Sequence, residues 1–162
     1  MRLPRGLVLT LSSSALAIAL SLVHFFEGVR YVAYQDVGGV WTICNGHTSH
    51  VLPGQVATKA QCQAMEAADT AEAADQVRRL ITVPMPPARL AALTDFVVNL
   101  GPVTLAKSSV RRDLNAGNTA AGCAAIDLYR DVDGHDCRLA RSDCPGIVTR
   151  RHVERWLCEM PQ

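Results

Sequence analysis

The chain has 162 residues and a net charge of +1, with 16 basic and 15 acidic side chains. This length fits one domain, or two small lobes that share a core. The basic residues are nearly all Arg and are dispersed rather than striped along one element, which argues against nucleic acid as a partner.

The first predicted element is an apolar segment at the N-terminus. Residues 6–26 hold no Asp, Glu, Lys or Arg over 21 positions, and two Arg residues precede them. This length can cross a bilayer, and the leading Arg pair predicts an N-terminus that stays in the cytoplasm. Four Ser residues, Thr10 and His24 lower the hydrophobicity, so we predict a weak membrane segment.

Two interpretations of this segment remain open. It can be a cleaved secretory signal, with Ala15-Leu16-Ala17 as the small-residue site. It can instead be an uncleaved anchor that later leaves the membrane. Glu27 follows the segment directly, so cleavage near Ala17 would remove much of the helix expected before Glu27. This position favours the uncleaved anchor.

Residues 27–48 carry the strongest chemical signal in the chain. Glu27 precedes Asp36 by nine residues, Thr42 follows six residues later, and a Gly-His pair ends at His47. The Val-Gly-Gly-Val stretch after Asp36 predicts a β-hairpin, with Glu27 on its helical side. The fold can therefore bring both acids to one groove. Two carboxylates near one bond form the general-acid and water-activating pair that cleaves a glycoside.

Five further helices are predicted, separated by Gly, Pro and polar residues. They span about residues 58–81, 89–100, 108–115, 119–130 and 147–159. The first is long and amphipathic. Its acidic residues recur at steps of three and are expected to face solvent: Glu66, Asp69, Glu72 and Asp75. Residues 131–146 are expected to form a polar loop.

Six cysteines form an even set, which predicts three disulfides in an oxidising compartment. Cys137 and Cys144 enclose a short polar loop and are the first expected pair. Spacing does not determine the other connections. If the helices beginning near residues 119 and 147 lie side by side, the favoured pairs are Cys123 with Cys158 and Cys44 with Cys62.

No metal ion or cofactor is expected. The sequence has no close CxxC or HxxxH grouping of the kind that binds zinc. Residues 131–134 are similar to the start of a calcium loop, but no Glu occupies the twelfth position.

The spacing of Glu27, Asp36 and Thr42, followed by Gly46-His47, resembles the active-site signature of phage-type lysozymes, glycoside hydrolase family 24. Two later stretches, FVVNLG at Asn99 and GIVTRRHVE at residues 146–154, also resemble segments of that family. The resemblance implies an α+β fold. A small β-hairpin lobe and a larger helical lobe, joined by the long helix, would enclose a peptidoglycan groove.

The resemblance also implies the reaction and its residues. The expected reaction is hydrolysis of the β-1,4 bond between N-acetylmuramic acid and N-acetylglucosamine. Glu27 would protonate the leaving oxygen, while Asp36 and Thr42 would direct a water to the opposite face, as in an inverting enzyme with carboxyl groups about 6.5–9.5 Å apart. His47 is expected to brace the hairpin. Asn99 either binds a sugar acetamido group or caps its helix.

Arg150 has two interpretations, an exposed position on the last helix or an ion pair that holds Glu27 in place. Arg151 has the same two, with the ion pair less favoured.

In its N-terminal arrangement the chain resembles the signal-anchor-release endolysins, a subgroup of the same family. Residues 1–26 would then tether a monomeric muramidase domain, residues 27–162, to the host inner membrane. Release into the periplasm would let Glu27 reach its partners and cause host lysis. The anchor lacks Cys, which argues for control by topology rather than by disulfide exchange.

Four alternatives remain at this stage. They are a lytic transglycosylase on the same bond, a muramidase secreted by a cleaved signal, a zinc amidase that uses His47 and His50, and a tethered binding module without catalysis.

Overall fold

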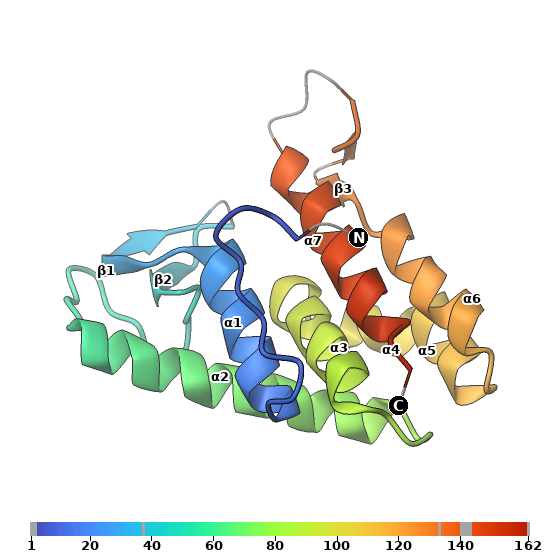
Figure 1. Cartoon of the computed structure of the whole chain (residues 1–162). Helices are drawn as coiled ribbons and strands as arrows, with labels where there is room; N and C mark the ends of the chain where they lie inside the picture. Colours follow the sequence, from blue (N-terminus) through green and yellow to red (C-terminus); the bar gives the residue numbers. More distant parts are fainter. Residues whose placement is uncertain (1–2, 37, 133, 140–143, 162) are drawn as a thin grey trace.

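The computed structural model describes residues 3–36, 38–132, 134–139 and 144–161 and shows an α+β molecule with two lobes (Figure 1). The fold class expected from the sequence is confirmed. The small lobe contains the hairpin of strands β1 (Arg30–Gln35) and β2 (Trp41–Cys44). The large lobe is helical, and α2 (Lys59–Leu80) runs beneath both lobes.

The N-terminal segment is divided into an irregular strap and a helix. Helix α1 (Ala15–Glu27) begins at Ser14, whose hydroxyl oxygen accepts a hydrogen bond from the backbone N–H of Ala17 at 3.3 Å. This cap limits α1 to 13 residues, so the continuous 21-residue segment expected at residues 6–26 is not a single helix here. Among the described residues, no helix is both long and apolar enough to cross a membrane.

The apolar face of α1 is part of the main core. Ile18, Ala19, Leu22 and Val23 are buried, at the i, i+4 spacing that places side chains on one helix face. This face packs against α2 and α3. The packing brings the C-terminal end of α1, where Glu27 lies, to the junction between the two lobes.

The hairpin forms where its Gly-Gly turn predicts it, and Val37 of that turn lies outside the described residues. Tyr34 pairs with Thr42 across the strands, and the backbone N–H of Asp36 donates to the carbonyl of Val40 at 3.0 Å. Gly39 has a φ of +76°, a conformation that glycine adopts without strain. The lobe has a small core of its own, formed by Ile43, Cys44, Val51, Ala57 and Cys62.

Helix α2 begins with the capping box that its sequence predicts, between Thr58 and Gln61. The expectation that its acidic residues all face solvent is wrong in part. Glu66 is only 8% exposed, because α1 packs over that side of α2. Asp69 keeps a side chain that is 41% exposed and pairs with His47. Glu72 and Asp75, further along the helix, are exposed as expected.

The large lobe consists of short helices around a nearly buried central one. Their bounds are α3 (Pro87–Leu100), α4 (Pro102–Lys107), α5 (Ser109–Asn115), α6 (Thr119–Ala124), the 3-10 helix η1 (Ala125–Leu128) and α7 (Pro145–Cys158). The helix expected at residues 119–130 is therefore split into α6 and η1, and the last helix begins two residues earlier than predicted.

The polar loop expected at residues 131–146 contains a second, very short hairpin. Its strands are β3 (Asp131–Val132) and β4 (His135–Asp136), which pair antiparallel. Residues 133 and 140–143 of this loop lie outside the described part of the chain.

Three disulfides are present, in the pairs favoured from the sequence. Cys44–Cys62 joins β2 to the first turn of α2, Cys123–Cys158 joins α6 to α7, and Cys137–Cys144 closes the loop before α7. Their sequence separations are 18, 35 and 7 residues.

Replacing the Cys123–Cys158 pair by alanine should lower the free energy of unfolding by about 4 kcal/mol, against about 2 kcal/mol for the Cys137–Cys144 pair. The longer loop releases more chain entropy in the unfolded state, and Cys123 and Cys158 are both fully buried. Denaturant unfolding of both double variants measures the difference. A larger loss for the Cys137–Cys144 variant would contradict the loop-length argument.

Candidate active site

A cleft of about 510 Å³ lies between the small lobe and the helices. It collects most of the residues that the sequence singled out: Glu27, Asp36, Thr42, His47 and Asn99. Arg150 does not line the cleft but contacts it through Glu27. Among the described residues, no group of three or more His, Cys, Asp or Glu side chains could hold a metal ion.

Glu27 occupies the last position of α1, with its side chain 24% exposed. Its Oε1 accepts a hydrogen bond of 2.5 Å from Nη1 of the buried Arg150. On the other side, the side-chain amide of Asn45 donates to the carbonyl of Gly28 at 2.5 Å, which joins the residue after Glu27 to the small lobe. Glu27 is therefore held between α7 and the end of β2.

Asp36 and Thr42 face the cleft from the two sides of the hairpin. Oδ1 of Asp36 accepts hydrogen bonds from the backbone N–H groups of Gly38 and Val40 at 2.9 and 2.8 Å, which fixes its carboxylate within the turn. The buried hydroxyl of Thr42 donates to the carbonyl of Val40 at 3.0 Å. Since its one hydrogen is used there, the Thr42 oxygen can only accept a hydrogen bond from a molecule in the cleft.

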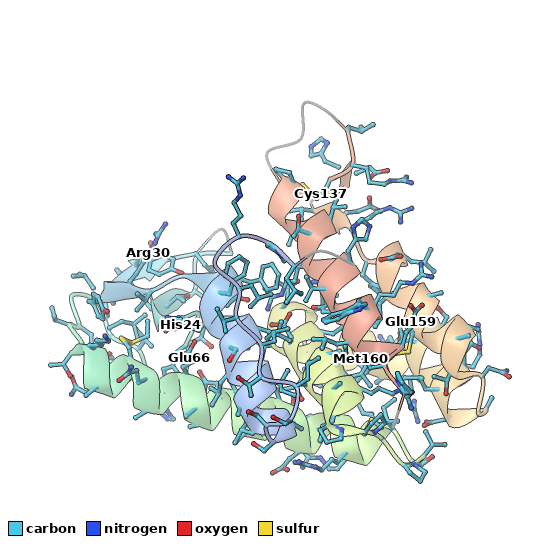
Figure 2. All side chains as sticks on the ribbon, viewed as in Figure 1. His24, Arg30, Glu66, Cys137, Glu159 and Met160 are labelled. Carbon is cyan, nitrogen blue, oxygen red and sulfur yellow. A yellow bond between two sulfur atoms is a disulfide. The ribbon has the colours of Figure 1, made fainter. Side chains whose placement is uncertain are left out.

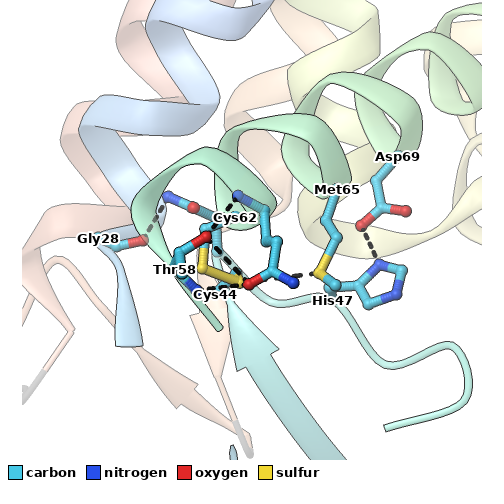
Figure 3. Close-up of a disulfide and its surroundings, with 9 residues drawn as sticks. Gly28, Cys44, His47, Thr58, Cys62, Met65 and Asp69 are labelled. Carbon is cyan, nitrogen blue, oxygen red and sulfur yellow. Dashed lines mark hydrogen bonds and ion pairs between the residues drawn. A yellow bond between two sulfur atoms is a disulfide. The ribbon is translucent and has the colours of Figure 1, made fainter. Parts of the chain in front are cut away.

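His47 connects the small lobe to α2 (Figure 3). Its Nδ1 lies 2.7 Å from Oδ2 of Asp69, and its Nε2 lies 3.1 Å from the carbonyl oxygen of Ser49. Both partners are acceptors, so both contacts are hydrogen bonds only when both ring nitrogens carry hydrogen. The backbone of His47 also exchanges two hydrogen bonds of 2.9 Å with Ile43.

Arg150 is the centre of a buried ionic network behind Glu27. It is 3% exposed and donates through Nε and Nη2 to both carboxylate oxygens of Asp95, at 2.9 and 2.8 Å. Glu154 lies 3.6 Å from its Nε. The ion pair is therefore the correct one of the two interpretations of Arg150. Burial alone would lower the pKa of Arg150, but Asp95 and Glu27 outweigh it and raise the pKa.

The second guanidinium of the network belongs to Arg151. It donates through Nη1 to Glu154 at 2.6 Å and through Nη2 to Oδ1 of Asn99. Complete burial raises the pKa of Glu154 well above its usual range.

Asn99 does not act as a helix cap, which was one of its two expected roles. Its side-chain oxygen accepts from Arg151, and the backbone of Gly101 ends α3 instead. This contact orients the amide at the edge of the cleft.

Sequence reasoning missed three residues that hold the site together: Asp95, Glu154 and Asn45. Asp95 stands in the apolar stretch LTDFVV of α3, and Glu154 occupies a core-facing position of α7. A charged residue among apolar neighbours was the available signal for Asp95, because such a residue is rarely buried without a partner. Asn45 gave no signal, since its partner is a backbone carbonyl.

Replacing Arg150 by Met should lower the free energy of unfolding by about 3–5 kcal/mol, because it leaves the fully buried Asp95 carboxylate uncompensated. The control is Arg155→Met, since Arg155 is 41% exposed in its pair with Asp127 and should cost about 1 kcal/mol or less. Adding Asp95→Asn to Arg150→Met should restore part of the loss. Equal losses for Arg150→Met and the control would contradict a buried network.

Comparisons with known proteins identify the family of the chain. The family model described as phage lysozyme matches residues 24–154. A protein of Enterobacteria phage PA-2 named SAR-endolysin is 31% identical over 163 residues, which cover 96% of this chain and 94% of that protein. A probable prophage lysozyme of Escherichia coli is 35% identical over 133 residues, 79% of this chain and 75% of that protein.

A solved structure, the muramidase domain of SpmX from Asticaccaulis excentricus, superposes with a TM-score of 0.77 at 26% identity. The alignment covers 88% of this chain and 95% of that domain. The fold, the cleft and the matched segment lead to one conclusion: the chain belongs to the phage lysozyme family and is a glycoside hydrolase that acts on peptidoglycan.

Proposed function

We propose that Glu27, Asp36 and Thr42 carry out an inverting hydrolysis of the β-1,4 bond between N-acetylmuramic acid and N-acetylglucosamine. The observation that carries the proposal is that these three residues, from a helix end, a turn and a strand, line one cleft between the lobes. The disulfide between the small lobe and α2 and the buried network behind Glu27 support a preorganised site of this kind.

Glu27 is the general acid that protonates the leaving oxygen. Its partner Arg150 is already neutralised by the bidentate contact with Asp95, so Glu27 can take up a proton without leaving Arg150 as an unbalanced buried charge. The contact also restricts the Glu27 side chain to one orientation. Arg150 is thus a positioning residue, and Asp95 positions Arg150.

Asp36 and Thr42 direct the attacking water. The backbone bonds to Asp36 engage Oδ1, so Oδ2 is the oxygen assigned to take the water's proton. The Thr42 oxygen accepts the second hydrogen of the same water, because its own hydrogen is donated to Val40. Two acceptors at the rim of the hairpin thereby aim the water's lone pair at the sugar carbon, on the face opposite Glu27.

His47 and Asn99 have supporting roles in this proposal. His47 braces the hairpin against α2 through Asp69, which keeps Asp36 and Thr42 at a constant distance from α1. Asn99, oriented by Arg151, offers its amide N–H groups to a polar group of the sugar chain, such as an acetamido carbonyl.

Replacing Glu27 by Gln should reduce peptidoglycan hydrolysis by about 10²–10⁴-fold, the usual contribution of a general acid. The matched control is Glu159→Gln, an exposed carboxylate at the far end of α7, which should retain full activity. Solubilisation of purified cell walls measures both. Undiminished activity of Glu27→Gln would contradict the assigned role.

The stereochemistry of the product tests the water-directing pair separately. An inverting enzyme releases the new reducing end as the α-anomer, which proton NMR detects before mutarotation. A β-anomer, or a 1,6-anhydro sugar detected by mass spectrometry, would remove Asp36 and Thr42 from the proposed mechanism.

We also propose that residues 1–26 first hold the enzyme at the inner membrane and are then released uncleaved. The names of the relatives and the weak hydrophobicity of residues 6–26 support this proposal. The structure adds a physical constraint, because Ile18, Leu22 and Val23 are fully used by the core. These side chains cannot lie in lipid and in the core at once. In a tethered chain, therefore, α1 is not packed against α2 and α3, and Glu27 does not contact Arg150.

Replacing Thr10 and Ser12 by Leu should keep the protein in the membrane fraction and delay lysis, because a more apolar segment leaves lipid less readily. Both positions are exposed in the folded enzyme, so the purified soluble variant should retain its activity. The opposite change, to Asn at both positions, should speed release. Unchanged distribution between membrane and soluble fractions in both variants would contradict the tether, and soluble protein lacking its first 17 residues would favour a cleaved signal.

A further inference from the structure

A contact between His24 and Glu66 lies one helical turn away from Glu27, and the mechanism above does not use it. Nδ1 of His24 lies 3.4 Å from Oε1 of Glu66, across the junction of α1 and α2 (Figure 2). The Glu66 side chain is 7% exposed, whereas that of His24 is 64% exposed. Within the described residues, Oε1 of Glu66 is buried and has no hydrogen-bond partner.

Glu66 separates two hollows in the surface. On one side it lines the cleft that contains Glu27. On the other side it lines a second hollow of about 350 Å³ together with His24 and Ser21. A buried carboxylate in this position joins the wall of the cleft to the last turns of α1.

The charged groups around this contact already have other partners. Glu27 and Asp95, from α1 and α3, are held by Arg150, and Asp69 of α2 is held by His47. Among the ion pairs of the described side chains, the one that Glu66 makes is with His24. Burial raises the pKa of Glu66, and the adjacent His24 partly offsets that effect.

We propose that His24 and Glu66 are positioning residues that hold α1, with Glu27 at its end, against α2. We propose further that the His24–Glu66 pair takes up one proton when α1 docks. The proposal rests on the role of Glu27 as the general acid. Helix α1 would then be held by two contacts. His24 contacts Glu66 of α2, and one turn later Glu27 contacts Arg150 of α7.

The direction of the pH effect follows from both groups. Docking of α1 buries Glu66, and a buried carboxyl group favours its protonated form. Docking also pairs Glu66 with an imidazole, which is charged only when protonated. Because burial of an unpaired Glu66 carboxylate is unfavourable, the docked pair holds one proton, so docking is favoured at low pH and weakens as pH rises.

Hydrogen exchange of the α1 backbone tests the proposal on the purified, full-length soluble protein. Exchange is measured at about pH 5.5 and about pH 8, either side of the histidine range, and corrected for intrinsic rates. We expect α1 protection in the wild type to fall about threefold or more between the two. His24→Gln should lose protection at the lower pH, and Glu66→Gln should gain protection at the higher pH. His152→Gln, an exposed residue on α7, should behave as the wild type.

Muramidase activity of the same proteins should follow the exchange data, with a flatter pH profile in both Gln variants. A His24→Gln variant with the wild-type pH dependence of exchange would overturn the proposal. So would a Glu66→Gln variant that is less protected at the higher pH. Because exchange does not depend on catalysis, a wrong assignment of Glu27 would abolish the activity correlation and leave the exchange result intact.

Discussion

Burial of the apolar face of α1 against α2 and α3 is the contact on which the cleft depends. Helix α1 ends at Glu27, so the position of that carboxylate is determined by how Ile18, Leu22 and Val23 pack in the core. No covalent link holds α1 to the helices it packs against, since the three disulfides all lie after residue 43. Glu27 thus lies on a helix that no disulfide holds to its neighbours, while the hairpin that carries Asp36 and Thr42 is tied to α2 by a disulfide and by His47.

Arg150 links this element to the rest of the large lobe. It contacts three carboxylates from α1, α3 and α7, at 2.5, 2.8 and 3.6 Å. Such a buried network adds little net stability, because desolvation offsets the attraction. The network instead orients Arg150. Asp95 binds Nε and Nη2 of the guanidinium group, which leaves Nη1 pointing toward Glu27. Glu27 meets that nitrogen only when α1 has reached its place.

The parts of the fold that the sequence predicted are those governed by local rules. The capping box of α2, the Gly-Gly turn after Asp36 and the Pro and Gly residues at helix ends are read from neighbouring residues, and the structure has each of them. The errors come from long-range packing. Glu66 follows the same acidic periodicity as Asp69, Glu72 and Asp75, yet α1 covers Glu66 alone of the four. Likewise, the cap at Ser14 makes α1 begin part-way along the apolar segment, which composition alone does not show.

The site was predictable to a similar extent. Glu27, Asp36 and Thr42 stand at fixed spacing and line one cleft, but their supports lie far away in the chain, as Asp95 and Arg150 show with a separation of 55 residues. The pair of Arg150 with Glu27 was among the expectations, but nothing in the sequence pairs Arg150 with Asp95, since each has several charged alternatives. The contact between His24 and Glu66, 42 positions apart, is hidden for the same reason.

The central claim is that α1 presents Glu27 to the bond to be cleaved while Asp36 and Thr42 hold a water on its opposite face. A crystal structure of the Glu27→Gln protein with a peptidoglycan fragment tests this most directly. The account predicts the glycosidic oxygen within hydrogen-bond distance of residue 27, and a water bound by both Asp36 and Thr42 beneath the sugar ring. A fragment bound across the cleft with its glycosidic oxygen out of reach of residue 27, or with no water between the other two side chains, would contradict it.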